Sequence, residues 1–333
     1  MRAVSQSVAN VRQELEDLAT YLTTHARPSH RDALLDPLGW IIQDEVLARA
    51  LKRIRRQFRA LGEVAMGPLQ YGLKTGLNEA FVVASATAQE LSSDSDYGSG
   101  LIREWIRGQD IRPWRAIPSG LKVIALQSSN DRGCLHPWKD SPTEPVAERM
   151  FRATCGRLYE HMTRFKVALQ RRTDRGRFWW ELRSCAYYGE LSRQKMVWKD
   201  IAYLPSFAWE SGGALVANTA FFCAGLEPWT MAILNSKCFA WLASCFLIEA
   251  KDAYFRWLTT DVALVPFPEL TETLRDKCRH LALNHVADGE SEALAYEAYD
   301  VSTDERDAIE TWYAARLASE TVQSIRERGN AAS

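Results

Sequence analysis

Hydrophobic residues near both ends of the chain recur every three or four positions, which is the spacing of amphipathic helices. This pattern predicts one helix over residues 4–24 and a second over residues 40–61. The polar face of the second helix is basic, as expected either of a solvated face or of a contact with an anion. Residues 270–328 are also predicted to be helical and charged.

Between these ends the hydrophobic residues fall into short runs separated by turns, a pattern typical of mixed strands and helices. We therefore expect an α+β (mixed α/β) fold with three parts: a helical connector over 1–62, a central domain over 63–269 and a helical extension over 270–333. Strands are predicted at residues 80–83, 123–126, 196–198 and 221–223, and helices at residues 101–105, 145–172 and 228–248.

Composition narrows the class of protein only slightly. The 333 residues are 47% hydrophobic and 25% charged, with a net charge of −1, so this is no histone-like polycation. Seven cysteines without a CxxC pair suggest reduced thiols in a cytoplasm. No apolar leader follows Met1, and the longest apolar run, Cys238 to Ile248, is too short to span a bilayer. We therefore expect no membrane partner.

A glycine-rich turn precedes the first predicted strand of the central domain. Gly72 and Gly76 permit backbone conformations and close approaches that other residues do not. Between and after them, Lys74, Thr75 and Asn78 present a cation, a hydroxyl and an amide, which suit a phosphate or a base edge. The alternative is an ordinary glycine turn before a strand.

Arginine and lysine alternate with tryptophan in three blocks, over residues 103–114, 171–183 and 193–199. Cations neutralise phosphates and flat aromatic rings stack on bases, so the blocks together favour a nucleic-acid surface. For any single block we favour the alternative, in which the tryptophans are core and the arginines form surface ion pairs.

Catalytic and metal-binding motifs are missing from the sequence. There is no methyl-donor loop, no adenine-N6 catalytic loop and no Walker A loop. Glu249 and Lys251 form half of a nuclease-like metal site, without its upstream partner. Cys134 with His136, and Cys278 with His280 and His285, lack zinc spacing and are interpreted as structural.

Seven short blocks of the chain resemble, in order, the TaqI-like C-terminal specificity domain. This is the target-recognition region of type IIG restriction-modification enzymes and related adenine-N6 DNA methyltransferases. The resemblance spans about Val64 to Trp312, and residues 295–300 are similar to a helix that follows the domain. The blocks are Gly72–Phe81, Ile106–Ile111, Leu169–Arg183, Lys195–Ile201, Asn218–Phe222, Ala232–Lys237 and Val265–Pro268.

The resemblance implies a DNA target-recognition module without its catalytic half, and not an enzyme on its own. The implied partners are double-stranded DNA and a methyltransferase or endonuclease subunit, which would hold S-adenosylmethionine; no cofactor or metal is expected in this chain. Gln109 stands where the family often has a base. The expected DNA contacts are Lys74, Thr75, Asn78, Arg107, Arg112, Arg171, Arg172 and Lys195, with Gly72, Gly76 and Gly108 shaping the turns.

Two other functions remain open at this point. The chain could be a metal-dependent nuclease that uses Glu249 and Lys251, or a protein-interaction subunit that does not contact DNA. Metal-dependent cleavage would support the first alternative. Absence of salt-dependent DNA affinity would support the second.

Overall fold

The computed structural model describes residues 44–93, 95–250, 253–284 and 289–318. The chain divides into two compact units, Met1–Arg49 and Ala50–Ser333, and the first is described only at residues 44–49. The helix predicted over residues 4–24 lies outside the described residues. The second predicted helix is present as α3, Glu45–Gln57. The boundaries predicted at residues 62 and 269 both fall within the second unit.

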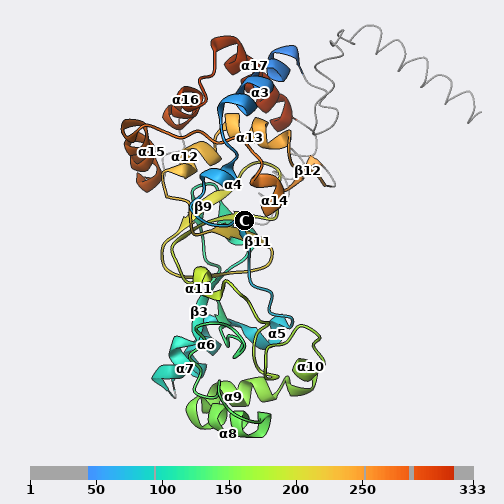
Figure 1. The fold of residues 1–333 in the computed structure, drawn as a ribbon. Coiled ribbons are helices and arrows are strands. Elements are labelled where there is room, and N and C mark those ends of the chain that lie inside the picture. Colours follow the sequence, from blue (N-terminus) through green and yellow to red (C-terminus); the bar gives the residue numbers. More distant parts are fainter. Residues whose placement is uncertain (1–43, 94, 251–252, 285–288, 319–333) are drawn as a thin grey trace, which may run out of the picture. The chain divides into compact units, whose positions relative to one another are not determined.

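One of two four-stranded sheets in the second unit is antiparallel, with strand order β1-β11-β7-β9 (Figure 1). Phe221 pairs with Trp198 and Phe222 with Val197. Every residue of β11 is buried, which explains its unbroken apolar sequence, because a strand covered on both faces shows no alternation. The strands are β1 Gln70–Tyr71, β7 Lys195–Lys199, β9 Phe207–Glu210 and β11 Ala220–Cys223.

A second sheet has the order β10-β3-β6-β2, in which β10 runs parallel to β3 and the other pairs are antiparallel. Two small sheets, β12-β13-β8 and β4-β5, complete the strands of the described residues. Their bounds are β2 Val82–Ala84, β3 Ile102–Ile106, β4 Ile111–Arg112, β5 Arg115–Ala116, β6 Leu121–Ile124, β8 Ile201–Ala202, β10 Leu215–Val216, β12 Ile248–Glu249 and β13 Phe255–Arg256.

Four predicted elements differ from the structure. The helix predicted over 228–248 is divided into α12, Thr230–Leu234, and α13, Lys237–Ser244, and residue 248 belongs to strand β12. A helix was predicted over 101–105, but residues 102–106 form strand β3, because pairing with β6 and β10 decides the conformation of a short apolar run. The predicted strand at 80–83 begins as helix α5, Asn78–Phe81. The long helix predicted over 145–172 is broken at Cys155, which has φ −140° and ψ 64°, and again before α10.

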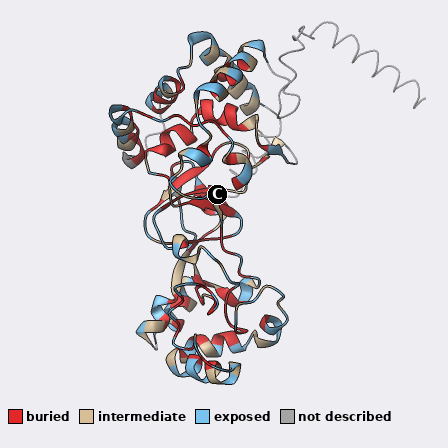
Figure 2. Ribbon diagram, viewed as in Figure 1, coloured by how far each residue is buried: buried red, intermediate tan, exposed pale blue. Residues whose placement is uncertain are grey.

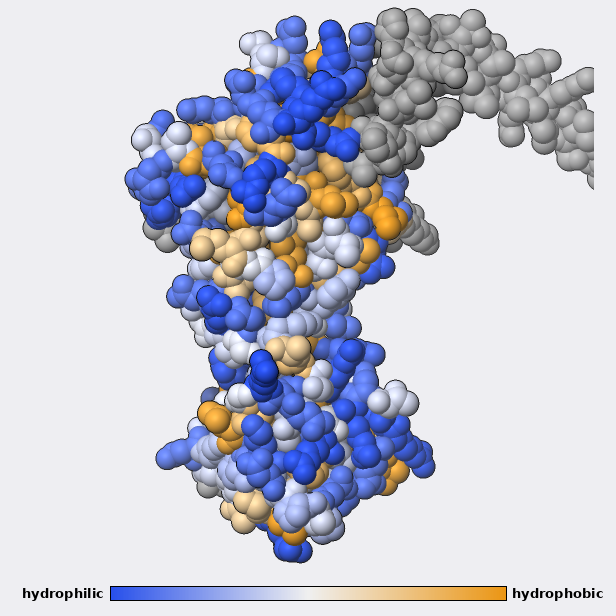
Figure 3. Space-filling view, in the orientation of Figure 1, coloured by the Kyte–Doolittle hydropathy of each residue, from blue (hydrophilic) through white to orange (hydrophobic). Residues whose placement is uncertain are grey.

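The apolar stripe of that interrupted helix is nevertheless buried. Phe151, Leu158, Met162 and Leu169 are all at 0% exposure, so the pieces still present one apolar face to the core. Figure 3 shows mostly hydrophilic side chains on the viewed surface of this region. The helices here are α6 Ser85–Leu91, α7 Asp96–Gly100, η1 Gly108–Asp110, α8 Glu144–Thr154, α9 Gly156–Thr163, α10 Lys166–Gln170 and α11 Tyr188–Leu191.

Helices also pack on the antiparallel sheet, where α12 contacts strand β9. Helix α13 begins at the N-cap Ser236, whose hydroxyl accepts a hydrogen bond from Phe239 N at 3.1 Å, and six of its residues are buried (Figure 2). This burial accounts for the long apolar run of the sequence. The remaining helices are α4 Leu61–Val64, α12 Thr230–Leu234, α13 Lys237–Ser244, α14 Thr259–Val262, α15 Glu272–Asn284, α16 Gly289–Ala298 and α17 Thr303–Leu317.

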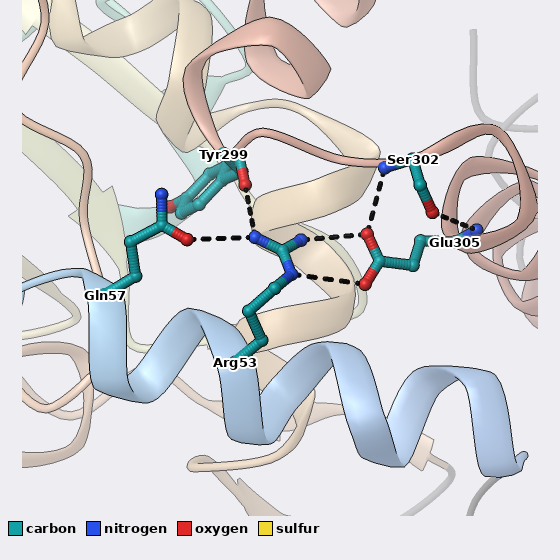
Figure 4. Close-up of polar contacts among 5 residues, drawn as sticks. All are labelled: Arg53, Gln57, Tyr299, Ser302 and Glu305. Atoms are coloured by element: carbon teal, nitrogen blue, oxygen red, sulfur yellow. Dashed lines mark hydrogen bonds and ion pairs between the residues drawn. The ribbon is translucent and has the colours of Figure 1, made fainter.

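Arg53 joins α3 to the start of α17 (Figure 4). Its guanidinium makes two contacts with the Glu305 carboxylate, at 2.8 and 3.3 Å, and donates to Tyr299 O at 3.3 Å. The same carboxylate accepts from Ser302 N at 2.9 Å and completes the capping box of α17. This member of the basic helix face therefore has an internal anionic partner.

The predicted α+β class is confirmed by this mixture of helices and small sheets. The alternative given for the aromatic residues also holds, because Trp105, Trp179, Trp180 and Trp198 are all at most 3% exposed and belong to the core. Within the described ranges, no helix combines the length and the apolar character needed to cross a membrane.

Candidate nucleic-acid interface

Residues 216–219 bring together two segments that the sequence singled out. Leu73, in the glycine turn, donates its N–H to Val216 O at 2.6 Å and accepts from Asn218 N at 3.0 Å. Ala217 donates to Ile106 O, at the end of β3, at 2.8 Å. The glycine turn and the Arg107-Gly108 segment are therefore attached to opposite sides of one short stretch of backbone.

Both contacts require glycine. A Cβ atom at Gly72 would overlap the carbonyl oxygen of Ala217, and one at Gly108 would overlap that of Thr219. Gly108 N also donates to Thr219 Oγ1 at 2.9 Å. Close approach of backbone to backbone therefore explains why these two positions lack a side chain.

Gly76 has a different requirement, because its φ of +73° lies in the left-handed region. Just before it, Thr75 is buried and its hydroxyl donates to Asn78 Oδ1 at 2.5 Å. The Thr75 hydroxyl and the Asn78 amide oxygen, both predicted to face DNA, therefore bond to each other in this structure. Asn78 is nevertheless exposed at the start of α5.

Arg172 fastens the glycine turn to the Trp-Trp segment. Its guanidinium donates to Thr75 O at 2.9 Å, to Trp179 O at 3.0 Å and to Glu181 O at 2.7 Å, and it lies 5.0 Å from the ring centroid of Phe81. Burial lowers the pKa of Arg172 to about 10. These contacts occupy the side chain, so Arg172 shapes the surface rather than presenting a free cation to it.

Glu181, beside these carbonyls, is a fully buried carboxylate that has only neutral hydrogen-bond donors. Oε1 accepts from Ser129 Oγ and from Trp138 Nε1, the latter at 3.1 Å. Oε2 accepts from Ser129 N at 3.0 Å and Phe178 N at 3.1 Å. Burial raises the pKa of Glu181, while these hydrogen bonds oppose the shift. The carboxylate holds the loop at 128–138 against the Trp-Trp segment.

A cavity of about 460 Å³ opens where the glycine turn, the segment after Glu181 and residue 218 meet. Lys74 lies on its wall and is ion-paired with Asp174 at 3.1 Å. Arg183 is exposed and forms no hydrogen bond or ion pair with any residue that the structure describes. The other lining side chains used below are Tyr71, Ser184, Tyr187 and Asn218.

The other predicted arginine contacts occupy different environments. Arg107 forms two charge-assisted hydrogen bonds with Asp110, at 3.0 and 3.1 Å, and the hydrogen bond to Asp110 raises its pKa. Arg112 is exposed and donates to Gln109 O at 2.5 Å and to Ile111 O at 3.0 Å. Arg171 is exposed and has no polar partner among the described residues.

The prediction that Lys195 contacts DNA is not supported by its position in the structure. Its side chain is at 0% exposure, and its ammonium donates to Glu210 Oε2 at 2.7 Å, to Ala214 O at 2.8 Å and to Arg193 O at 3.1 Å. Burial lowers the pKa of Lys195, while the adjacent Glu210 carboxylate opposes that shift. All three ammonium protons have acceptors, so Lys195 serves the core in this structure.

The structure describes only part of the proposed nuclease pair, since Glu249 is exposed on β12 and residue 251 lies outside the described ranges. Among the residues that are described, no group of His, Cys, Asp and Glu could hold a metal ion. His136 shares a 2.6 Å hydrogen bond with the Tyr97 hydroxyl through Nδ1 and stacks on Trp138, in agreement with a structural role.

Sequence reasoning did not select every residue that lines the cavity. Ser184 and Tyr187 directly follow the Trp-Trp-Glu-Leu-Arg block, and Asn218 lies in a matched block, but none was named as a contact. Arg183 was noted only as part of its block. Their proximity to the glycine turn depends on the hydrogen bonds of Arg172 and of residues 216–219, which leave no local pattern in the sequence.

No protein-family model and no curated protein matches this chain. Among solved structures, it is similar to the type IIL restriction-modification enzyme MmeI in complex with DNA, with 11% identity and a TM-score of 0.42 over 79% of this chain and 36% of that one. It is also similar to the type IIG restriction endonuclease BpuSI, with 10% identity and a TM-score of 0.46 over 82% and 32%.

This chain therefore spans about a third of the length of each of these enzymes. Both neighbours are restriction-modification enzymes. At these TM-scores, however, the likeness assigns no function to this chain.

Proposed function

We propose that this chain is a DNA target-recognition module that acts with a separate catalytic partner. The observation that carries the proposal is the meeting of two sequence blocks, about the glycine turn and about Trp179-Trp180, at one cavity. About a hundred residues separate these blocks in the sequence, and both resemble parts of the same specificity domain. A cation from each block, Lys74 and Arg183, stands on the cavity wall.

Within this proposal, Lys74 and Arg183 neutralise phosphates, and the Asn218 amide offers donors and an acceptor to a base edge. Arg107, Arg112 and Arg171 extend the positively charged surface. Arg172, Glu181 and the three glycines position these groups without contacting DNA. This division matches the usual one in which phosphate contacts fix the register and base contacts carry specificity.

The proposal also assigns the chemistry to the partner. An adenine-N6 methyltransferase subunit, or the missing catalytic half of one enzyme, would bind S-adenosylmethionine and modify the base, while this chain would select the site. Such a system works where the DNA is, in the cytoplasm of a bacterial or archaeal cell. It would serve restriction and modification in defence against phage.

The test is binding of the full chain to mixed-sequence duplex DNA across a salt series. Affinity should fall steeply with salt, and a Lys74→Ala, Arg183→Ala variant should bind more weakly. The slope of log affinity against log salt should decrease by about 0.9 for each phosphate that the variant no longer neutralises. A Lys277→Ala, Arg279→Ala variant on α15 removes the same charge elsewhere and should match the wild type.

Two results would contradict the proposal. One is the absence of salt-dependent DNA binding at low ionic strength, which would favour a protein-interaction subunit. The other is an equal loss of affinity in the cavity variant and in the α15 variant, which would show that net charge rather than this surface attracts the DNA.

A further inference from the structure

The cavity beside the glycine turn is too small for a duplex but has the size and lining of a small-molecule site. Its volume of about 460 Å³ falls within the range of roughly 300–1,000 Å³ that is usual for ligand pockets. Base pairs inside a helix present only their edges to a groove. A nucleotide could therefore enter this cavity only after leaving the base stack.

Two tyrosines supply flat surfaces on the cavity wall. Tyr71 is 47% exposed and its ring stands edge-on to Phe221, with centroids 5.0 Å apart. Tyr187 is half-buried against Phe222, with centroids 6.0 Å apart. Each ring packs on a phenylalanine of β11. Aromatic side chains of this kind stack on unpaired bases.

The polar groups of the cavity complement the other parts of a nucleotide. Arg183 has no anionic partner among the described residues, and Lys74 has only the solvent-accessible Asp174. No carboxylate of the described part of the chain lines the cavity. The Asn218 side chain, which bonds to none of the described residues, can donate and accept at a base edge. Cations, rings and an amide thus meet in one hollow.

We propose that this cavity receives one unpaired nucleotide of the bound DNA, with its phosphate at Arg183 and Lys74 and its base against Tyr71 or Tyr187. The inference rests on the proposed DNA-binding function and concerns a cavity lined by residues of this chain. By holding a nucleotide outside the stack, the module would recognise DNA through local opening as well as through groove contacts.

The experiment compares two duplexes of the same sequence, one fully paired and one with a single-nucleotide bulge, by fluorescence anisotropy at fixed salt. The full chain should bind the bulged duplex about tenfold or more tightly, because binding no longer has to unpair a base. Tyr71→Ala should lose this preference and bind the two duplexes with similar affinity. Tyr71→Phe, which keeps the ring, should retain the preference, and thermal unfolding should show both variants to be folded.

Equal binding of the two duplexes would overturn the inference and leave the proposed function standing. Persistence of the bulge preference in Tyr71→Ala and in a second variant, Asn218→Ala, would also overturn it. If the chain binds neither duplex, the proposed function fails, and the cavity is then tested directly with deoxynucleoside monophosphates by NMR titration. Shifts centred on residues 71, 187 and 218 would support the cavity; their absence would reject it.

Discussion

Two buried glutamates show two ways of keeping a carboxylate inside this protein. Glu210, on β9, is paired with the Lys195 ammonium across the β7-β9 ladder at 2.7 Å. Glu181 has no cation within ion-pair distance among the described residues and is held by three neutral N–H groups and one hydroxyl. Arg172 donates a hydrogen bond to the main-chain carbonyl of Glu181 and not to the Glu181 carboxylate.

The two buried glutamates stabilise different kinds of backbone structure. The Lys195–Glu210 pair joins two strands that already share backbone hydrogen bonds, so it secures regular structure. In the Trp-Trp region Arg172 and Glu181 do not pair with each other. Arg172 donates hydrogen bonds to main-chain carbonyl groups of loops, and Glu181 accepts hydrogen bonds from main-chain N–H groups of loops. Loops need side-chain partners of this kind, because their backbone N–H and C=O groups are not paired in a β-sheet.

Breaking the ion pair should produce the largest effect on stability. Lys195→Met leaves the Glu210 carboxylate buried without its cation, which costs about 3–5 kcal/mol of unfolding free energy. Adding Glu210→Gln should restore most of the loss, because the amide oxygen can still accept from Gly212 N. Urea unfolding measures both variants. A double variant no more stable than Lys195→Met would show that the two side chains are not coupled as described.

Glu181→Gln should lower the unfolding free energy of the protein. Unlike Lys195→Met, it cannot be compensated by changing a charged partner, because Glu181 has none among the described residues. In one orientation its NH₂ faces the N–H groups of Ser129 and Phe178; in the other it faces the Trp138 indole N–H, while the Ser129 hydroxyl can turn to accept. Either orientation leaves a buried donor unpaired, at a cost of about 1–3 kcal/mol. Ser129→Ala removes only the hydroxyl donor and is the milder control. Chemical unfolding followed by tryptophan fluorescence measures the change; a loss below that of Ser129→Ala would contradict the assigned network.

Lowering the pH should destabilise the Trp-Trp region through protonation of His136, which stacks on Trp138 beside Glu181. Burial lowers the pKa of His136 from 6.5 to about 4, so its contribution to stability is present above pH 6.5 and is lost as pH falls through 4. The expected loss is about 2 kcal/mol between pH 7 and pH 5. The raised pKa of Glu181 acts in the opposite direction, since its protonation favours the folded state.

A His136→Gln variant isolates the contribution of the histidine. Thermal unfolding measured from pH 7 to pH 5 should give a flatter profile for this variant than for the wild type. The remaining slope includes His161, whose pKa burial also lowers. Parallel profiles for the variant and the wild type would show that His136 is protonated without penalty, which would contradict its burial.

The sequence predicted those elements in which local pattern and tertiary structure agree. Strand β11 is a short apolar run, and β7 has an apolar centre at residues 196–198; both were predicted. Strand β3 was predicted as a helix because its partners β6 and β10 come later in the chain. The break at Cys155 was missed because the apolar stripe continues in phase across it.

The candidate site was predictable in its parts and not in its assembly. The glycines, the basic residues and the Trp-Trp segment are visible in the sequence. Their arrangement depends on Arg172, whose hydrogen bonds go to main-chain carbonyls, and a carbonyl is present at every residue. For the same reason Lys195 was assigned to a surface: nothing in its own segment marks Glu210 as its partner.

The backbone junction at residues 216–219 has a consequence for how this protein could diversify. Gly72 and Gly108 meet the main chain there, and Leu73 and Ile106 bond to it through peptide groups alone. The frame therefore does not depend on which side chain stands at residue 74 or 218. Replacing those side chains would change which ligand groups the cavity binds and leave the backbone contacts intact. New specificities could therefore arise by a few substitutions without a change of fold.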